Sequence, residues 1–250
     1  MWKILMWFFF LRTDEGALEM KIDLSGIPLI DNHCHPFPSG RALNRTYERS
    51  FTLSRLPVSP VNTRNTLFFQ MLNRKLRGVL NLSPDCSIEE IEHVRDELIK
   101  KDRKAYIDML WQKVGYRGMI ADIGSPITKQ LLTADEMAEF DREMQGYVVR
   151  KINRIEWVAE DVIESGTHRF KEFTDLYVAG IKKRVKDQGL VGLKSIIAYK
   201  TGLDIKVLSE SEFCKYYYLY LSDPGNREYE KVFRDYCFCI GCEVAAELDL

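Results

Sequence analysis

The chain has 250 residues, of which 46% are hydrophobic and 29% are charged, and its formal net charge is −1. This composition is that of an ordinary globular protein, and it argues against intrinsic disorder, a collagen-like fibre and a strongly basic nucleic-acid binder. The length suits one large domain or two small ones, and it also matches a typical (β/α)8 barrel of about 250 residues.

The cysteines and the N-terminus bear on location. Six cysteines are too sparse in a chain of this length for a disulfide-rich secreted scaffold, so we expect reduced thiols and a cytoplasmic protein. The run Met1–Leu11 is strongly apolar, but it is shorter than the roughly 20 residues that cross a bilayer. No small-residue cleavage site follows it, so a signal or anchor is the less favoured interpretation. We predict a non-domain extension over residues 1–19 and a domain over residues 20–250, with translation starting at either Met1 or Met20.

The first part of the chain combines a strand, a long loop and several helices. The apolar run Ile27–Asp31 predicts a short buried strand. Residues 36–66 are rich in Pro, Arg, Asn, Ser and Thr, which predicts a long loop with short helical pieces. Ser87 and Glu90 have the spacing of a capping box, which marks the start of a helix. Helices are expected over Phe68–Leu80, from Ser87 past Leu98, and over Tyr106–Val114.

Three further strands alternate with helices. Apolar or β-branched runs predict strands over Gly118–Ile123, Tyr147–Ile155 and Leu190–Tyr199. This alternation predicts an α/β fold built from βαβ units around a parallel sheet. The four predicted strands are half of the eight that a closed barrel needs. Helices are expected from Thr133 to about Met144, near Glu160, over Phe170–Gln188 with Gly189 as C-cap, over Phe213–Leu221, and from Tyr229 to about Leu248.

The sharpest chemical feature is the pair His33 and His35, which directly follows the first predicted strand. Side chains two residues apart on a strand point to the same face, and parallel α/β folds place their sites at the carboxyl ends of strands. Imidazole nitrogens ligate zinc, iron and nickel. We therefore predict that both histidines are metal ligands; the alternative is a pair of hydrogen-bonded surface histidines in a loop.

Lys194 is the second feature, because it is the one charge within the apolar run Leu190–Tyr199. A lysine in an apolar strand is costly unless it is paired or functional. It could ligate a metal after carbamylation, bind a substrate carboxylate or pair with a neighbouring glutamate. The plainer alternative is a side chain that points into solvent from the end of a barrel.

Two residue clusters are predicted to be structural. Cys237, Cys239 and Cys242 lack a convincing fourth metal ligand and lie in an apparent helix, where free cysteine commonly packs as a small hydrophobe. The tyrosines over residues 216–218, together with Tyr220, spread around a helix without an accompanying basic stripe. We predict packing for them, and no stacking of nucleic-acid bases.

Two longer motifs resemble a known family. The segments IPLIDNHCHPF (residues 27–37) and VGLKSIIAYKTGL (residues 191–203) resemble the amidohydrolase-related metal-dependent hydrolases of TIM-barrel fold. The similarity is greatest to the branch whose domain is also found fused to glutamine-synthetase-like domains. It covers roughly residues 24–250, and the second motif is far more specific than the first. It implies a partial (β/α)8 TIM-like barrel, with about the first four β/α units plus inserted helices.

The resemblance also implies a site and a cofactor. In such enzymes one or two metal ions at the carboxyl ends of the strands activate water for hydrolysis, or serve C–C cleavage in decarboxylating relatives. His33 and His35 match the ligand pair of the first strand. Lys194 matches the lysine of the fourth-strand motif, which makes it the predicted catalytic residue. The expected cofactor is a divalent metal ion, with zinc as the first choice.

Further site residues follow from the same resemblance. Arg154 and Glu156 fall where the family's third strand carries Arg-x-Glu, and together with Tyr199 and Lys200 they are predicted to bind substrate. Lys200 departs from the pattern, since relatives usually carry Arg there, and Lys loses bidentate recognition of a carboxylate. Asp122 ends the second predicted strand; an acidic residue in such a place can equally be a cap or a salt-bridge partner.

The resemblance stops halfway through the family's active site. The fifth and sixth strands of the family each supply a histidine, and the eighth supplies an aspartate that moves a proton. Here His93 lies inside a predicted helix and His168 lies at the start of another, so neither replaces the missing pair. The sequence thus predicts the N-terminal portion of a hydrolase barrel, without the C-terminal half.

Two functions follow as expectations. The first is a truncated metal-dependent hydrolase that cleaves a C–N or related bond of a small molecule. The alternative is a catalytically incompetent fragment or divergent non-enzymatic member that binds metal weakly or assembles with another chain. Exposed barrel edges would favour self-association, and neither nucleic acid nor a membrane is expected as a partner.

Overall fold

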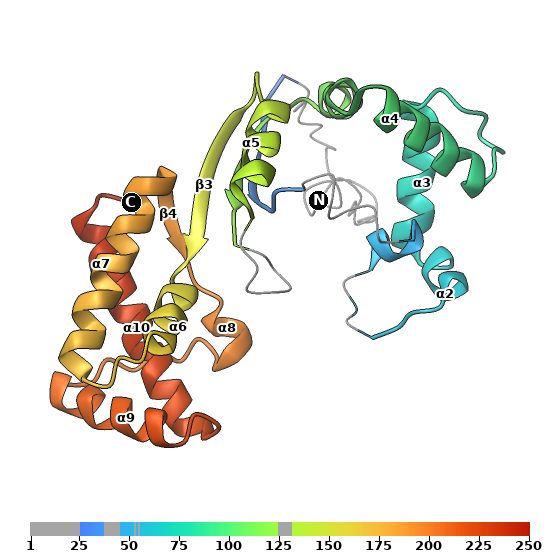
Figure 1. The fold of residues 1–250 in the computed structure, drawn as a ribbon. Helices are drawn as coiled ribbons and strands as arrows, with labels where there is room; N and C mark the ends of the chain where they lie inside the picture. Colours follow the sequence, from blue (N-terminus) through green and yellow to red (C-terminus); the bar gives the residue numbers. More distant parts are fainter. Residues whose placement is uncertain (1–25, 38–45, 53, 55, 125–131) are drawn as a thin grey trace, which may run out of the picture. The chain divides into compact units, whose positions relative to one another are not determined.

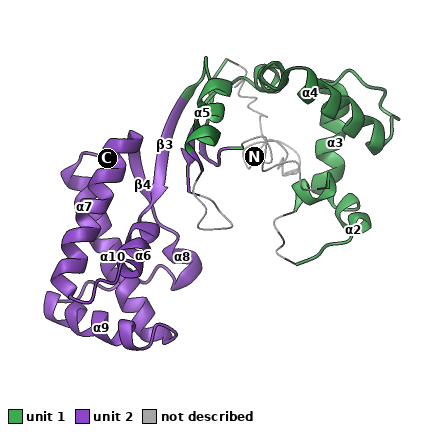
Figure 2. Ribbon diagram, in the orientation of Figure 1, with its two compact units in different colours: residues 1–31, 37–118, 134–148 green, residues 32–36, 119–133, 149–250 purple. Residues whose placement is uncertain are grey.

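A computed structural model of the chain describes residues 26–37, 46–52, 54, 56–124 and 132–250 (Figure 1). The predicted extension lies outside the described residues, as does part of the predicted long loop, and a single domain over residues 20–250 stays a prediction. The contacts between residues divide the chain into two compact units (Figure 2). Unit 1 comprises residues 1–31, 37–118 and 134–148, and unit 2 comprises residues 32–36, 119–133 and 149–250.

The strands of the described residues form a four-stranded sheet in the order β1-β2-β3-β4. They are parallel and alternate with helices, which confirms the predicted α/β fold. In the β3–β4 pair, Arg154 lies opposite Lys194, so the last residues of both strands are neighbours. The strands are β1 (Leu29–Cys34), β2 (Tyr116–Asp122), β3 (Val148–Arg154) and β4 (Leu190–Lys194).

The helices that precede β3 lie in unit 1. The Ser87 hydroxyl accepts a hydrogen bond from the Glu90 amide, which confirms the predicted helix start. The two helices predicted to either side of Asp102 form one helix, α4, with a kink at that residue (φ −163°, ψ 97°). Phe69, Ile91 and Phe140 are buried in this unit. Its helices are the 3-10 helix η2 (Glu48–Phe51), α2 (Pro60–Arg64), α3 (Leu67–Val79), α4 (Ile88–Lys113) and α5 (Ala134–Glu143).

Unit 2 holds the remaining helices around one hydrophobic core. Phe173, Tyr177 and Ile181 of one helix pack there with Tyr217 of another. The end of α7 at Gly189 is confirmed, since this glycine adopts the left-handed conformation (φ 60°, ψ 43°) that closes many helices. The helices are α6 (Ile155–Glu164), α7 (Phe170–Gln188), α8 (Ile197–Lys200), α9 (Glu210–Ser222) and α10 (Arg227–Glu247).

The first strand differs from its prediction in position and burial. β1 begins and ends later than the predicted run Ile27–Asp31, so His33 lies within the strand. The prediction of a buried strand is wrong, because Leu29 is 37% exposed and Ile30 is 41% exposed. The physical reason is that β1 is an edge strand of the described sheet, with a hydrogen-bonded neighbour on one side.

The last strand is shorter than predicted. The sequence predicts one strand over Leu190–Tyr199, but β4 ends at Lys194 and residues 197–200 form the short helix α8. The carboxylate of Glu156 accepts hydrogen bonds from the Ser195 hydroxyl and, at 2.8 Å, from the Ile196 amide. These bonds use an amide that would otherwise pair in a sheet, so they end the strand and begin the turn. As a result Lys194 is the last residue of the strand rather than its middle.

The tyrosine and cysteine clusters contribute some of their members to the packing of unit 2. Tyr217 is almost fully buried, and the ring of Tyr220 stacks on that of Phe233 with centroids 4.4 Å apart, which confirms the predicted packing for these two residues. For Tyr218 the prediction is wrong, because its side chain lies on the outer face of α9 and is 49% exposed.

Cys237 is buried on α10 as predicted, whereas Cys239 is partly buried and Cys242 is exposed, so the predicted core packing is wrong for Cys242; the six cysteines are free thiols. In the described part of the chain, no helix has the length and apolar character needed to cross a membrane.

Candidate metal centre

Residues at the carboxyl ends of all four strands come together within unit 2. His33 lies near the end of β1 and His35 follows it, while Asp122 ends β2, Arg154 ends β3 and Lys194 ends β4. Hydrogen-bonded strands therefore hold four of these residues, and His35 follows β1 directly. Ligand sites of α/β folds lie at this end of the sheet.

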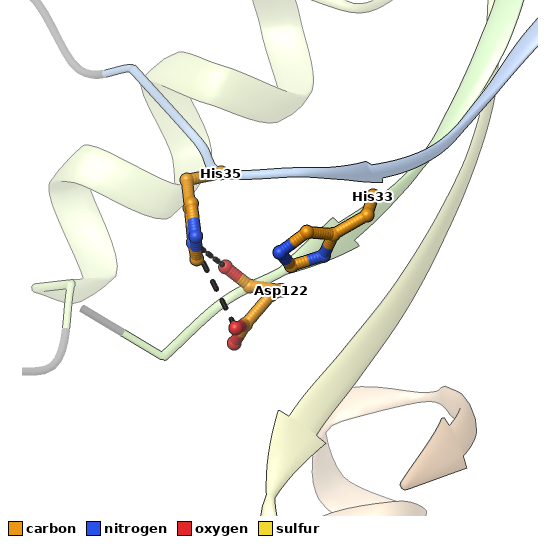
Figure 3. Close-up of side chains that lie close together, drawn as sticks. All are labelled: His33, His35 and Asp122. Atoms are coloured by element: carbon orange, nitrogen blue, oxygen red, sulfur yellow. Dashed lines mark hydrogen bonds and ion pairs between the residues drawn. The ribbon is translucent and has the colours of Figure 1, made fainter. Parts of the chain in front are cut away.

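His33, His35 and Asp122 form a group that could hold a metal ion. One potential ligand atom of each residue lies within 4.8 Å of those of the other two. Figure 3 shows the two imidazoles and the carboxylate directed toward one another, His33 from the first strand, His35 from the segment just after it and Asp122 from the next strand. The two rings lie edge to face, with centroids 5.2 Å apart. The predicted pair therefore does point to one side, and it gains a third partner.

The surroundings of His35 favour the neutral imidazole. Its Nδ1 lies 3.0 Å from the backbone oxygen of Asp122, so Nδ1–H can donate and leave the lone pair of Nε2 for a ligand. Burial lowers the pKa of His35 from its ordinary 6.5 and outweighs the opposing effect of the Asp122 carboxylate. Neutral imidazole is the form that binds metals.

Asp122 is the hub of the cluster. It is fully buried, and its Oδ1 accepts a hydrogen bond from the Gly124 amide at 3.0 Å. Its Oδ2 accepts from both Nε and an Nη of Arg154, at 3.0 Å each, and from Nζ of Lys194 at 2.9 Å. Burying a carboxylate is costly unless charges and hydrogen bonds compensate it, and here two cations do so.

Arg154 is held as firmly as the carboxylate that it binds. It is 7% exposed, and its guanidinium lies 5.3 Å from the centre of the Trp157 ring, a cation–π contact. The guanidinium is therefore fixed by Asp122 on one side and by an indole on another. This arrangement orients Asp122; the predicted contact of Arg154 with substrate stays a prediction.

Lys194 reaches two members of the metal group. Its Nζ lies 2.7 Å from Nε2 of His33 and 3.3 Å from Nδ1 of the same ring, in addition to 2.9 Å from Oδ2 of Asp122. Of the roles open to Lys194 from the sequence, the structure thus shows pairing with a carboxylate, although the partner is an aspartate of β2 and not a glutamate.

The remaining predicted site residues lie elsewhere. Glu156 is buried on α6, where one carboxylate oxygen holds the turn after β4 and the other, Oε2, is buried without a hydrogen-bond partner. Tyr199 and Lys200 lie on α8, and Tyr199 is 87% exposed. Glu156 therefore positions the end of β4, whereas the predicted substrate contacts of all three residues remain predictions.

The sequence did not single out Asp122 as a ligand. The sequence shows that Asp122 ends a strand, but many acidic residues at strand ends only cap the strand. Its approach to His35 depends on which strands are neighbours, and the sequence does not state that. Among groups of His, Cys, Asp and Glu in the described residues, His33–His35–Asp122 is the one with metal-like spacing. Cys237, Cys239 and Cys242 do not form one.

The donor set fits a divalent metal ion. Two imidazoles and a carboxylate match the three protein ligands that catalytic zinc sites commonly use, with a position left open. The fit has one electrostatic cost: the Asp122 oxygen and the His33 ring are already in contact with the Lys194 ammonium.

In fold, the chain is similar to a protein of Lactobacillus casei ATCC 334 that has been provisionally assigned as a metal-dependent hydrolase. The TM-score is 0.64 at 19% sequence identity, and the match covers 91% of this chain and 57% of that one. At this identity the similarity shows the fold alone. The four described β/α units match about half of a TIM-barrel hydrolase, which confirms the predicted partial barrel and, at the level of fold, the resemblance to metal-dependent hydrolases.

In sequence, the chain is 25% identical over 200 residues to the protein fluG of Emericella nidulans. This match covers 72% of the chain but only 22% of fluG, so the chain spans a minor part of that relative. No family model matches the chain.

Proposed function

We propose that the chain forms the metal-binding part of a metal-dependent hydrolase that cleaves a C–N or related bond of a small molecule. One observation carries the proposal: His33, His35 and Asp122 converge from two neighbouring strands to within 4.8 Å at the carboxyl end of the sheet. The similarity in fold to a protein assigned to this class supports it. The six free thiols support a cytoplasmic location as part of the same proposal.

The proposed metal is zinc, because two of the three donors are imidazole nitrogens. When bound, such an ion polarises a substrate carbonyl and makes water a better nucleophile. The chain's own residues would hold it: His33 and His35 as nitrogen ligands, and Asp122 as an oxygen ligand oriented by Arg154. His93 lies within α4 and His168 precedes α7, so the proposal is limited to one ion.

The remaining predicted residues take proposed roles around this centre. Lys194 is the proposed catalytic residue, since its amine touches both His33 and Asp122. Tyr199 and Lys200 follow the end of β4 on an exposed helix, where they are available to a substrate. Glu156 would act indirectly, by fixing the turn that carries them.

The proposal predicts that metal binding depends on the two histidines. After dialysis against zinc, the wild-type protein should retain about one ion per chain. The double variant His33→Ala/His35→Ala should bind more than about 100-fold more weakly, since even loss of an outer partner of a ligand costs 10–100-fold. Metal content is measured by atomic absorption after dialysis.

The matched control replaces the other two histidines. His93→Ala/His168→Ala removes the same number of imidazoles from exposed positions outside the centre, and it should retain metal as the wild type does. Equal, near-zero metal in wild type and in the His33/His35 variant would refute the metal centre.

A second candidate is a non-enzymatic chain that binds metal and assembles through its sheet edge. The observation that favours it is the exposure of apolar side chains on the edge strand β1, where Leu29 and Ile30 are both more than a third exposed. An open edge with apolar side chains is a template for pairing with another strand. We therefore propose self-association through β1.

This proposal predicts a concentration-dependent dimer. Sedimentation of the wild-type protein should show association in the micromolar range, and Ile30→Lys should weaken it by about tenfold or more, because an edge lysine opposes strand pairing. Lys75→Ala, at an exposed position of α3 and not part of β1, should leave association unchanged. A wild-type monomer at all concentrations would contradict self-association.

A further inference from the structure

Lys194 stands where a metal ion would be opposed by its charge. Its Nζ is 2.7 Å from His33 Nε2, 3.3 Å from His33 Nδ1 and 2.9 Å from Asp122 Oδ2. A zinc ion bound at about 2.1 Å would lie within about 5 Å of that amine if it used Nε2 of His33, and within about 5.5 Å if it used Nδ1. The zinc ion and the Lys194 ammonium would then share the single carboxylate of Asp122.

The charges already present in the cluster add to this repulsion. Asp122 carries one negative charge, and Arg154 and Lys194 bring one positive charge each. These three side chains together therefore carry a surplus of positive charge before any metal arrives. Water screens the repulsion on the exposed side of the centre, where His33 lies, but screening is weaker beside the fully buried carboxylate of Asp122.

Of the two cations, Lys194 is the one able to leave. Arg154 is buried, bonds Asp122 through two nitrogens and lies over Trp157. Lys194 ends the strand β4 at the edge of the described sheet, and its side chain is 19% exposed. A lysine amine on four rotatable bonds can turn toward water without moving the backbone.

We propose that the Lys194 ammonium is an internal placeholder for the metal ion, competing with it for His33 and Asp122. This inference rests on the proposed function, because it presumes that His33 and Asp122 bind a metal. With no metal bound, the ammonium compensates Asp122 and holds His33 in place. Metal entry displaces it, and the displaced amine then lies beside the centre, where the substrate would bind.

The test is the zinc affinity of charge variants at position 194. Lys194→Met removes the ammonium and keeps an unbranched stem, and it should bind zinc about tenfold more tightly than wild type, since a charge-assisted contact no longer has to be broken. Lys194→Arg keeps the charge and should bind no more tightly than wild type. The exposed Lys206→Met removes the same charge outside the centre and should not change the affinity. A competing chelator dye reports affinity, in degassed buffer without bicarbonate so that Lys194 stays an amine.

Two outcomes would overturn the placeholder. Weaker binding by Lys194→Met would make Lys194 a ligand, and unchanged binding would mean that it does not compete. In both cases binding that still depends on His33 and His35 leaves the proposed function standing, whereas absence of binding in wild type would remove both. Circular dichroism and thermal unfolding verify the fold of each variant, and Lys194→Gln repeats the measurement if Lys194→Met does not fold.

Discussion

Replacing Asp122 by alanine is expected to lower the free energy of unfolding by about 3–5 kcal/mol, the cost of breaking a buried ion pair by removing one partner. Asp122 is fully buried, and its carboxylate accepts hydrogen bonds from Arg154 and Lys194. Lys194 can turn toward water, but Arg154 is 7% exposed and is packed on Trp157. The cost therefore comes mainly from a buried guanidinium that has lost its carboxylate. Urea unfolding followed by circular dichroism measures it.

A surface ion pair provides the matched control. Asp175 pairs with Lys171 along α7, and the two side chains are 65% and 88% exposed. Asp175→Ala should cost no more than about 0.5 kcal/mol, because water replaces the lost partner. The buried pair is isolated by a double-mutant cycle in which Arg154→Met is combined with Asp122→Ala; their coupling should reach about 1–3 kcal/mol. If Asp122→Ala costs no more than Asp175→Ala, the buried cluster is not as described.

The part of this centre that the sequence predicts is the part that local patterns encode. His33 and His35 share a face because of the two-residue repeat of a strand, and that repeat is visible in the sequence. The end of α7 is likewise predicted by a local signal, because glycine readily adopts the left-handed conformation that Gly189 has there. Both predictions concern residues whose geometry is set by their near neighbours in the chain.

The part that the sequence does not predict depends on strand order. Asp122 meets Arg154 and Lys194 because β2, β3 and β4 lie side by side in a fixed register, and no local pattern states a register. The overlong prediction for β4 has the same origin. Its residues continue to favour a strand, but the carboxylate of Glu156, from a separate helix, ends it after Lys194.

Two glycines that look alike in the sequence should respond in opposite ways to alanine. In β2, a Cβ at Gly118 would stand 2.2 Å from the backbone oxygen of Val148 and 2.9 Å from its Cβ. A carbonyl of a neighbouring strand cannot turn aside as a flexible side chain can, so β2 and β3 would have to separate. Gly118→Ala should therefore cost about 3 kcal/mol, at the upper end of overpacking.

Gly78 is the contrasting case. It lies on the exposed side of α3, and a Cβ at this position would meet nothing within 4 Å. Because glycine in a helix pays more conformational entropy than alanine, Gly78→Ala should raise the free energy of unfolding by about 0.5–1 kcal/mol. Urea unfolding of the two variants in parallel measures both changes in the free energy of unfolding, the expected decrease for Gly118→Ala and the expected increase for Gly78→Ala. A small or stabilising effect at Gly118 would contradict the close approach of the two strands.

The effect at Gly118 should extend to the metal centre. Gly118 and Asp122 lie on the same strand, and β3 ends at Arg154, the partner of Asp122. A displacement between β2 and β3 would therefore lengthen the contact that orients the Asp122 carboxylate, and a ligand whose supporting bond is lost binds metal about 10–100-fold more weakly. Gly118→Ala should thus lose both stability and zinc affinity, whereas Gly78→Ala should gain stability with unchanged affinity. If Gly118→Ala loses stability but keeps its zinc affinity, the carboxyl end of the sheet keeps its geometry independently of the spacing between β2 and β3 at Gly118.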